Sequence, residues 1–335
     1  MKVGLVGAGF MGVTHAAGWA ETEAEFVGIV AETTAEATAL AKQYNLKIYP
    51  DLASMLPDVD VVDICTPTHL HHEMTLQAAA AKKDIICEKP LGRTTAQSRE
   101  MIEVCRKAGV KLLVAHVVRF FTEYALAKAS VTRGDIGKPG VIRLNRGSFR
   151  PKKPAGNWFL DETKSGGILM DMMIHDFDFA RWIAGDVESV FAKKVTTANP
   201  DAPIDYGLAI LKHRSGAISH ITGAWAYPPP TFRTHLEIAG DGGLIEFDSA
   251  DSSPILNLVA KTNSNSPDVG LPSSPVSESP YTTQIKEFYS VLLGEKQPRI
   301  NAEDGMAAVQ IAEAAIQSAA TGRAIVLEQL AEVLS

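Results

Sequence analysis

Gly7-Ala8-Gly9-Phe10-Met11-Gly12 stands near the start of this 335-residue sequence, directly after the apolar run Val3-Gly4-Leu5-Val6 and before a stretch typical of a helix. In the pattern Gly-x-Gly-x-x-Gly, the first glycine permits a tight turn and the second lets the backbone approach a pyrophosphate. The third lets the helix pack closely on the strand. The N-terminus of that helix offers unpaired N–H groups and a positive dipole to the phosphates. We therefore expect Gly7, Gly9, Phe10 and Met11 to bind a dinucleotide.

A carboxylate follows the second predicted strand, Phe26 to Val30, at about the distance that ribose recognition requires. The residue directly after the strand is Ala31, and the acid, Glu32, comes one position later. Glu32 either accepts the hydroxyls of the adenosine ribose or is a solvated loop residue. A carboxylate there repels the additional phosphate of NADP, and residues 31–40 contain no Arg or Lys to bind that phosphate. The sequence favours NAD and leaves NADP as the alternative.

The first third of the chain alternates apolar runs with stretches rich in Ala, Leu, Glu and Lys, which are strong helix formers. This alternation is typical of a parallel sheet covered by helices on both faces. We predict a doubly wound α/β Rossmann domain over residues 1–118. After the glycine loop, its helices are expected at Ala35 to Tyr44, Thr75 to Lys82 and Thr95 to Lys107, and its later strands at Val59 to Ile64, Asp84 to Cys87 and Val110 to Val114.

Beyond residue 118 the pattern changes to strands of a mainly antiparallel sheet. We predict an α+β domain over residues 119–335 for substrate binding and oligomerisation. His213 to Gly216 is expected to be a hairpin turn, and Ser249 to Pro280, rich in Ser, Pro and Asn, a long exposed loop or two short strands joined by one. Other expected elements are strands at Val141 to Arg146, Tyr206 to Leu211 and Ile218 to Gly223, and helices at Met172 to Ile183, Thr282 to Leu293 and Ala302 to Thr321.

The composition limits the classes of molecule that this protein is expected to bind. Hydrophobic residues at 46%, charged residues at 21% and a net charge of −7 are ordinary for a soluble enzyme and disfavour nucleic acid or an anionic membrane as partner. No apolar stretch approaches the roughly 18 residues of a membrane span. The three cysteines, Cys65, Cys87 and Cys105, are sparse and odd in number, as expected in a reducing compartment. We expect a cytoplasmic protein with a small-molecule substrate.

Three further stretches follow the glycine loop in a characteristic order and spacing. They are Cys65-Thr66-Pro67-Thr68-His69-Leu70-His71, Cys87-Glu88-Lys89-Pro90-Leu91, and Gly166-Gly167-Ile168-Leu169-Met170-Asp171-Met172-Met173-Ile174-His175-Asp176. Together they resemble the glucose-fructose oxidoreductase, inositol dehydrogenase and MocA family, and the resemblance covers nearly the whole chain. It implies hydride transfer between a nicotinamide and a hydroxyl-bearing carbon of a sugar, cyclitol or related polyol. It also implies a homodimer or homotetramer formed through the outer face of the second sheet.

The resemblance also implies roles for residues of the first two stretches and of the second domain. Thr66, Pro67 and His71 would line the nicotinamide ribose and ring, and Glu88 with Lys89 would border the reacting carbon. From the second domain, Asp171 and His175 would face the substrate. Arg119 matches an arginine that the family often places near the substrate; alternatively, it only braces the hinge between the domains.

The residues themselves support these roles. Thr66-Pro67 and Glu88-Lys89 come just beyond predicted parallel strands, at the edge where doubly wound folds bind ligands. Asp171 and His175 are one helical turn apart, so we expect them to share a face and to meet a common ligand. Alcohol oxidation needs a group that accepts the hydroxyl proton and a cation that stabilises the developing alkoxide. His175 suits the first role and Lys89 the second, or Lys89 with a lowered pKa is the base.

Two other groups of residues have alternative interpretations. Trp158, beside Asn157, either packs on a sugar face, with Asn157 binding hydroxyls, or seals the interface between the domains. His69, His71 and His72 are clustered as zinc ligands can be, but they lack a Cys-x-x-Cys or His-Glu-x-x-His partner motif, so we expect no metal.

Two other functions remain compatible with the sequence. One is a redox-neutral NAD-dependent glycosidase of the same superfamily, which takes a hydride and returns it. The other is a non-catalytic sensor that keeps the dinucleotide site, although the presence of Lys89, Asp171 and His175 argues against it.

Overall fold

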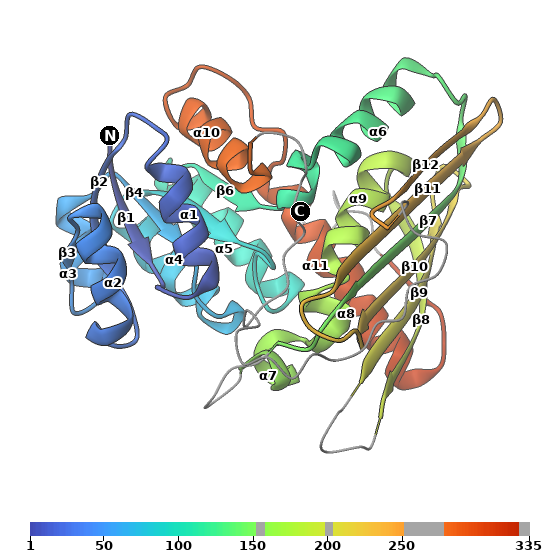
Figure 1. Ribbon diagram of the computed structural model, residues 1–335, viewed down its shortest axis with the longest axis horizontal. Helices are drawn as coiled ribbons and strands as arrows, with labels where there is room; N and C mark the ends of the chain where they lie inside the picture. Colours follow the sequence, from blue (N-terminus) through green and yellow to red (C-terminus); the bar gives the residue numbers. More distant parts are fainter. Residues whose placement is uncertain (152–157, 198–203, 251–277, 328–335) are drawn as a thin grey trace. The chain divides into compact units, whose positions relative to one another are not determined.

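The computed structural model describes residues 1–151, 158–197, 204–250 and 278–327 (Figure 1). The chain divides into two compact units. The first consists of Met1–Phe121 and Ser274–Met306, and the second of Thr122–Ser273 and Ala307–Ser335. None of the described helices is long and apolar enough to cross a membrane.

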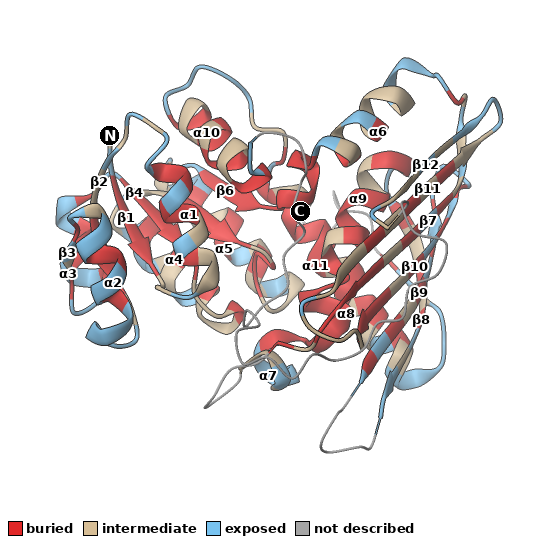
Figure 2. Cartoon of the chain, in the orientation of Figure 1, coloured by how far each residue is buried: buried red, intermediate tan, exposed pale blue. Residues whose placement is uncertain are grey.

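The first unit contains a six-stranded parallel sheet in the order β3-β2-β1-β4-β5-β6. The strand order reverses between β1 and β4, and such a reversal marks the ligand-binding edge of a doubly wound fold. The central strands are buried and mainly apolar, as expected for a sheet covered on both faces (Figure 2). The strands are β1 (Lys2–Val6), β2 (Glu25–Val30), β3 (Lys47–Ile48), β4 (Val61–Ile64), β5 (Asp84–Glu88) and β6 (Leu112–Ala115).

Several helices of the first unit begin or end where local chemistry satisfies their terminal backbone groups. Thr33 and Glu36 form a capping box at the start of α2, and Gly109 ends α5 in the left-handed conformation. The predicted helices of this region are confirmed to within a few residues. They are α1 (Phe10–Trp19), α2 (Thr34–Tyr44), α4 (His71–Ala80) and α5 (Thr95–Ala108), and the short helix α3 (Leu52–Met55) was not predicted.

A later segment of the chain completes the core of the first unit. Helix α10 (Pro280–Leu292) contacts α1, and a Cβ at Gly18 would lie only 2.9 Å from Cγ1 of Ile285. Ile285 and Phe288 are fully buried in one apolar cluster with Trp19 and strand residues such as Val3. The close approach therefore depends on a glycine in α1.

The second unit is built on a seven-stranded mixed sheet in the order β12-β11-β7-β10-β9-β8-β13. Strands β7 and β10 pair in parallel and the other pairs are antiparallel, so the predicted mainly antiparallel sheet is confirmed. The hairpin turn at His213 to Gly216 is also confirmed, by a bond from the Gly216 N–H to the His213 carbonyl. The strands are β7 (Pro139–Ser148), β8 (Val187–Thr196), β9 (Asp205–His213), β10 (Ile218–Trp225), β11 (Phe232–Gly240), β12 (Leu244–Asp248) and β13 (Ile325–Val326).

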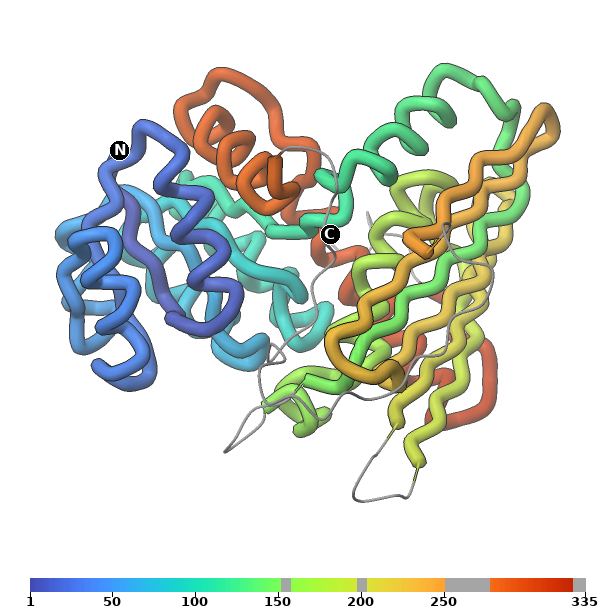
Figure 3. Tube along the Cα trace, viewed as in Figure 1, coloured from blue at the N-terminus to red at the C-terminus, as the bar shows by residue number. Residues whose placement is uncertain are grey.

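Short helices cover one face of this sheet, and the long strands run side by side beneath them (Figure 3). Gly207 and Gly223 lie opposite each other on β9 and β10. A Cβ at Gly207 would lie 2.6 Å from the Met173 sulfur, and one at Gly223 would lie 2.4 Å from its Cγ. The glycine pair thus forms the recess that receives Met173. The helices of this unit are α6 (Thr122–Arg133), α7 (Glu162–Ser165), α8 (Gly167–Asp171), α9 (Ile174–Ala184) and most of α11 (Ala302–Thr321).

Candidate functional site

The glycine loop has the backbone geometry of an anion-binding turn. Gly7 has a φ of +108°, which disfavours other residues, and a Cβ there would lie 2.4 Å from the Cys65 carbonyl oxygen. A Cβ at Gly12 would lie 2.0 Å from the carbonyl oxygen of Gly7. Gly9 is exposed and caps α1 without any side-chain hydrogen bond, so the first N–H groups of α1 face a ligand position. The loop therefore fits a pyrophosphate.

The acid predicted to bind ribose lies at the same edge of the sheet. β2 ends at Val30, whose carbonyl accepts a hydrogen bond from the Gly7 N–H at 2.8 Å. Glu32 follows two residues later and is exposed. Its carboxylate is therefore accessible to a ligand beside the glycine loop.

Two further loops follow the neighbouring strands at this edge. Thr66 and Pro67 come after β4, and the Glu88-Lys89 turn comes at the end of β5. The Thr66 hydroxyl contacts the sulfur of Met74 at 3.6 Å. Because β1, β4 and β5 are adjacent and parallel, all three loops emerge at one edge.

His71 connects these two loops. It is buried, with Nδ1 2.8 Å from the Pro90 carbonyl and Nε2 2.9 Å from the Thr66 carbonyl. Burial lowers the pKa of His71, so the ring carries one N–H, which donates to one of the two carbonyls. The structure thus gives His71 a bracing position between the loops, and its contact with the cofactor remains a prediction.

A buried polar cluster lies behind the same loops. His15, on α1, places Nδ1 2.9 Å from Asp63 Oδ2 and Nε2 3.1 Å from Glu88 Oε1. The Trp19 indole N–H donates to Asp63 at 2.7 Å, and the Cys65 sulfur lies 3.2 Å from His15 Nδ1. The donor atoms of His15, Asp63 and Cys65 all lie within 4.8 Å of one another.

The charge of this cluster follows from its contacts. Burial favours a neutral His15, yet the Asp63 carboxylate outweighs it and raises the pKa of His15 well above its ordinary value. Burial also raises the pKa of Cys65, which keeps the thiol protonated. His15 is therefore an imidazolium between two carboxylates.

The second unit holds Asp171 and His175 on two separate helices, which corrects the expectation that they share one helix face; the helix expected at Met172 to Ile183 is found at Ile174–Ala184. Asp171 is the last residue of α8, and His175 is the second residue of α9. Between them the Met173 N–H bonds back to the Ile168 carbonyl at 3.0 Å, five residues earlier. The physical reason is the recess formed by Gly207 and Gly223, which draws Met173 onto the sheet. The argument from one-turn spacing therefore does not apply.

A buried ion pair anchors α9 next to His175. Arg146 on β7 donates from Nε and Nη2 to the two oxygens of Asp176 at 2.8 and 2.9 Å. Both side chains are almost fully buried, and Nη2 also donates to the Tyr124 hydroxyl at 3.3 Å. This pair fixes the first turn of α9, from which His175 projects.

Arg119 braces the first unit internally. It is 2% exposed and donates from Nη1 to the Arg299 carbonyl at 3.0 Å and to Asp304 Oδ2 at 3.1 Å. These bonds tie the segment after β6 to the returning segment within the first unit, so neither the predicted substrate contact nor the predicted hinge role is tested by them. A contact of Arg119 with substrate remains a prediction.

The other predicted positions are Trp158 with Asn157, the Ser249 to Pro280 loop and the clustered histidines. Trp158 is half-buried and stacks on Phe159, with ring centroids 3.9 Å apart, while Asn157 lies outside the described residues. Residues 251–277 of the predicted Ser249 to Pro280 loop also lie outside them. Of the clustered histidines, His72 bonds to Glu100 at 2.8 Å and so has a different partner from His71.

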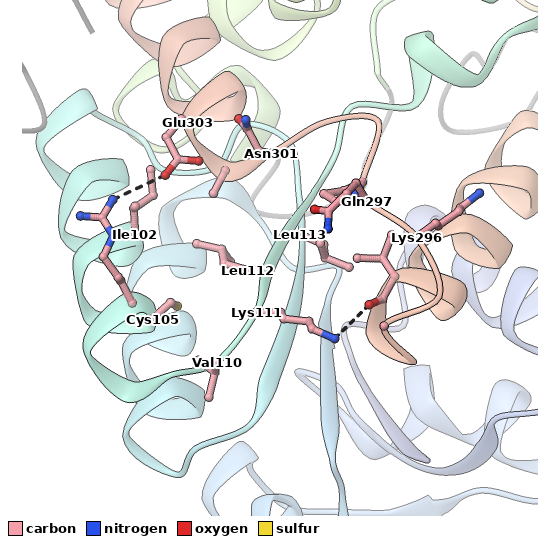
Figure 4. A pocket seen from close by; sticks show the side chains of 15 residues that line it. Ile102, Cys105, Val110, Lys111, Leu112, Leu113, Lys296, Gln297, Asn301 and Glu303 are labelled. Atoms are coloured by element: carbon pink, nitrogen blue, oxygen red, sulfur yellow. Dashed lines mark hydrogen bonds and ion pairs between the residues drawn. The ribbon is translucent and has the colours of Figure 1, made fainter. Parts of the chain in front are cut away.

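A separate cavity of about 390 Å³ lies in the first unit between α5, the start of β6 and residues 291–303 (Figure 4). Two basic side chains that line the cavity already have partners within the protein. Lys111 donates to the carbonyls of Val291 and Leu292 at 2.9 and 2.7 Å, and Arg106 pairs with Glu303 at 3.6 Å. Because it adjoins the beginning of a parallel strand, it is at the opposite edge from the glycine loop. The cavity is therefore distinct from the dinucleotide site.

Sequence reasoning missed His15 and Asp63. The available signal was a carboxylate within the otherwise apolar strand Val61-Val62-Asp63-Ile64. An isolated acid in a buried strand requires a buried partner.

Comparison with known proteins agrees with this geometry. Residues 1–116 match the family model described as "Oxidoreductase family, NAD-binding Rossmann fold", and residues 124–246 match the GFO/IDH/MocA C-terminal domain. The chain is 29% identical over 340 residues to myo-inositol 2-dehydrogenase of Thermotoga maritima, covering 98% of this chain and 99% of that one. It is 34% identical over 222 residues to levoglucosan dehydrogenase of Pseudarthrobacter phenanthrenivorans, covering 62% and 57%.

A solved structure confirms the fold over the full length. The crystal structure of a probable dehydrogenase from Thermotoga maritima superposes with a TM-score of 0.81 at 27% identity, covering 99% of this chain and 100% of that one. The two family models together match well over half of the chain. The chain therefore belongs to the GFO/IDH/MocA family of oxidoreductases, whose Rossmann domain binds NAD.

Proposed function

We propose that this protein transfers a hydride between NAD and a hydroxyl-bearing carbon of a sugar, cyclitol or related polyol. The observation that carries the proposal is the glycine loop at the edge where β1, β4 and β5 end, with Lys89 on the turn after β5. The myo-inositol and levoglucosan dehydrogenases among the relatives support the substrate class.

In this proposal residues 1–118 form the dinucleotide domain, with α10 packed into its core, and the rest of residues 119–335 form the domain for substrate and oligomerisation. The bound NAD supplies the hydride acceptor. Backbone groups of Gly7, Gly9, Phe10 and Met11 hold its phosphates, and Glu32 accepts the ribose hydroxyls. Residues of the next two loops border its nicotinamide end: Thr66, Pro67, His71, Glu88 and Lys89.

Three side chains act on the substrate in this proposal. Lys89 and His175 share the tasks of accepting the hydroxyl proton and stabilising the alkoxide, and Asp171 orients the substrate. Arg119 and Trp158 provide further contacts. Because a lysine cation and a histidine base are both expected near one hydroxyl, either can be the proton acceptor.

We expect purified protein to form reduced nicotinamide when it is incubated with NAD and a panel of inositols, aldoses and anhydrosugars. The absorbance of the reduced nicotinamide measures the reaction. We expect turnover with at least one panel member at about 1–10³ s⁻¹, the ordinary enzyme range, and a higher kcat/KM with NAD than with NADP because Glu32 repels the extra phosphate.

Complete absence of oxidation across the panel, and of reduction of the matching ketones, would contradict the proposal. Tightly retained cofactor with bond cleavage but no net reduced nicotinamide would instead indicate a redox-neutral reaction.

We further propose that a second copy of the chain covers the outer face of the seven-stranded sheet. Apolar side chains gather there as cross-strand neighbours: Val195 lies opposite Tyr206, and Phe191 lies opposite Ile210. Val195, Tyr206 and Ile210 are 61%, 42% and 39% exposed. Exposed apolar residues gathered on one face of a sheet in this way are typical of interfaces.

Light scattering is expected to give a dimer or tetramer mass for the wild type and a smaller mass for Ile210→Glu, because the variant would bury a charge in the interface. Leu126→Glu on α6 is the matched control, since Leu126 is 62% exposed outside this face, and it should keep the wild-type mass. A monomeric wild type would exclude the proposed interface.

We also propose a cytoplasmic location, supported by the three cysteines, which are free and buried.

A further inference from the structure

His15 has the contacts of a residue that holds part of the site in place. Both of its ring nitrogens face carboxylates, with Nδ1 at Asp63 and Nε2 at Glu88. Ionised carboxylates only accept hydrogen bonds, so each nitrogen carries a proton and donates. His15 and Asp63 are completely buried and Glu88 is 5% exposed, so these bonds are made in a medium where charge-assisted contacts are strong.

Glu88 connects His15 to the next residue, Lys89. Its Oε1 accepts from His15 at 3.1 Å, and its Oε2 accepts from the backbone N–H of Lys89 at 3.0 Å. With both oxygens held by donors from α1 and from the turn itself, the carboxylate has a single orientation. The backbone of Lys89 is therefore fixed relative to α1, the helix that begins at the dinucleotide loop.

Asp63 holds the other side of the imidazole ring. Its Oδ2 also accepts the Trp19 N–H at 2.7 Å, one turn along α1 from His15. The carboxylate is thus bound to α1 at two points. This arrangement fixes the rotation of the ring, so that Nε2 points at Glu88.

We propose that His15 is a positioning residue for hydride transfer: supported by Asp63, it holds Glu88 and through Glu88 the backbone of Lys89, so that the lysine and the dinucleotide loop keep one relative geometry. The proposal rests on the proposed role of Lys89. It assigns a second task to α1, which presents its N-terminus to phosphate and its first turns to the Glu88-Lys89 turn.

Two variants that place a neutral amide at position 15 distinguish this role from simple core packing. In His15→Gln the side-chain amide reaches about as far as Nε2 and can donate to Glu88. In His15→Asn the amide matches Nδ1 and can donate only to Asp63. Both variants lose the buried cation, so their free energies of unfolding should fall by similar amounts.

Their rates of hydride transfer should differ. In single turnover we expect His15→Gln to stay within about 3-fold of the wild type and His15→Asn to fall about 30- to 100-fold, because displacement of a reacting group by about 1 Å costs on the order of 10²-fold. NADH affinity should stay the same in both. Equal rates in the two variants, or rates that follow stability, would overturn the proposal.

His213→Gln is the matched control. His213 is also a buried histidine with two hydrogen bonds, to the Gly185 carbonyl and the Ser219 hydroxyl, but it lies in the hairpin of the second unit. Its loss should lower stability and leave single-turnover rates unchanged.

The pH profile provides a second readout, which holds even if His15→Asn fails to fold. The groups that face His15 are Asp63 and Cys65 at the end of β4 and Glu88 on β5. Because the folded pKa of His15 is raised, its bonds are complete below its unfolded pKa and are lost as the pH rises through the folded pKa. Asp63→Asn should therefore move the alkaline decline in rate to lower pH, and an unmoved decline would contradict the proposal.

The same variants distinguish failure of this inference from failure of the proposed function. If Lys89→Met keeps its activity, the role of Lys89 is wrong. If Lys89→Met is inactive but His15→Gln and His15→Asn behave alike, only the role of His15 is wrong.

Discussion

Lys89→Met is expected to lower turnover about 10³-fold or more while NADH affinity stays within about 3-fold of the wild type. A side chain that transfers a proton or stabilises an alkoxide contributes roughly 10²–10⁴-fold to the rate. Methionine keeps most of the length of the lysine and removes its charge, so the half-buried turn after β5 keeps its packing. The measurement is kcat by absorbance of reduced nicotinamide, with NADH affinity by fluorescence titration.

Lys89→Arg separates the two chemical roles left open between Lys89 and His175. Arginine stays a cation in proteins and cannot accept a proton near neutral pH. If Lys89 only stabilises the alkoxide, Lys89→Arg should keep much of the activity and His175→Asn should lose it. If Lys89 is the base, both Lys89 variants should be equally inactive.

Lys107→Met is the matched control for loss of a lysine. Lys107 lies on α5 with its side chain 79% exposed and its ammonium 4.0 Å from Glu103. Exposed pairs of this kind contribute little, so activity should be unchanged. A fully active Lys89→Met would exclude Lys89 from the chemistry.

The Rossmann part of the fold could be predicted because local signals there agree with the tertiary structure. The apolar runs at β1, β2 and β4 and the Gly-x-Gly-x-x-Gly turn each specify their own conformation, and the structure confirms the parallel sheet. Strands β8 and β11 gave weaker signals, since only part of each is buried and polar residues interrupt them. Such strands are defined by their partners, which sequence periodicity does not show.

The return of the chain to the first unit could not be predicted either. Helix α10 was expected at Thr282 to Leu293 and is found at Pro280–Leu292. Its packing partner is set by a recess at Gly18 that lies more than 250 residues earlier. An amphipathic pattern shows that a helix has a buried face but not which surface covers it.

The positions of the candidate-site residues could likewise be predicted only in part. Loops directly after strands placed Thr66, Glu88 and Lys89 correctly at one edge, because all parallel strands present the same end there. The sequence does not predict the helix break between Asp171 and His175, because Met172 and Met173 are good helix formers. Only the glycine recess on the distant strands explains why the chain turns at that point.

Asp176→Ala is expected to lower the free energy of unfolding of the second unit by about 3–5 kcal/mol, the usual cost of leaving one charge of a buried pair without its partner. Arg146 would lose its ion pair with Asp176 while keeping its bond to Tyr124 and its neighbouring aromatic rings. Three of the four tryptophans, Trp158, Trp182 and Trp225, belong to this unit, so urea unfolding followed by tryptophan fluorescence reports chiefly on it.

A double variant tests whether the loss comes from the unpaired charge. In Arg146→Met with Asp176→Leu, two apolar side chains replace the pair, and such replacements are often neutral or stabilising. Most of the lost stability should therefore return. Because Asp176 also lies in the first turn of α9, where a negative charge is favourable, we expect the double variant to stay slightly less stable than the wild type. Equal destabilisation of the single and double variants would instead mean that packing volume, not charge, fixes α9 beneath His175.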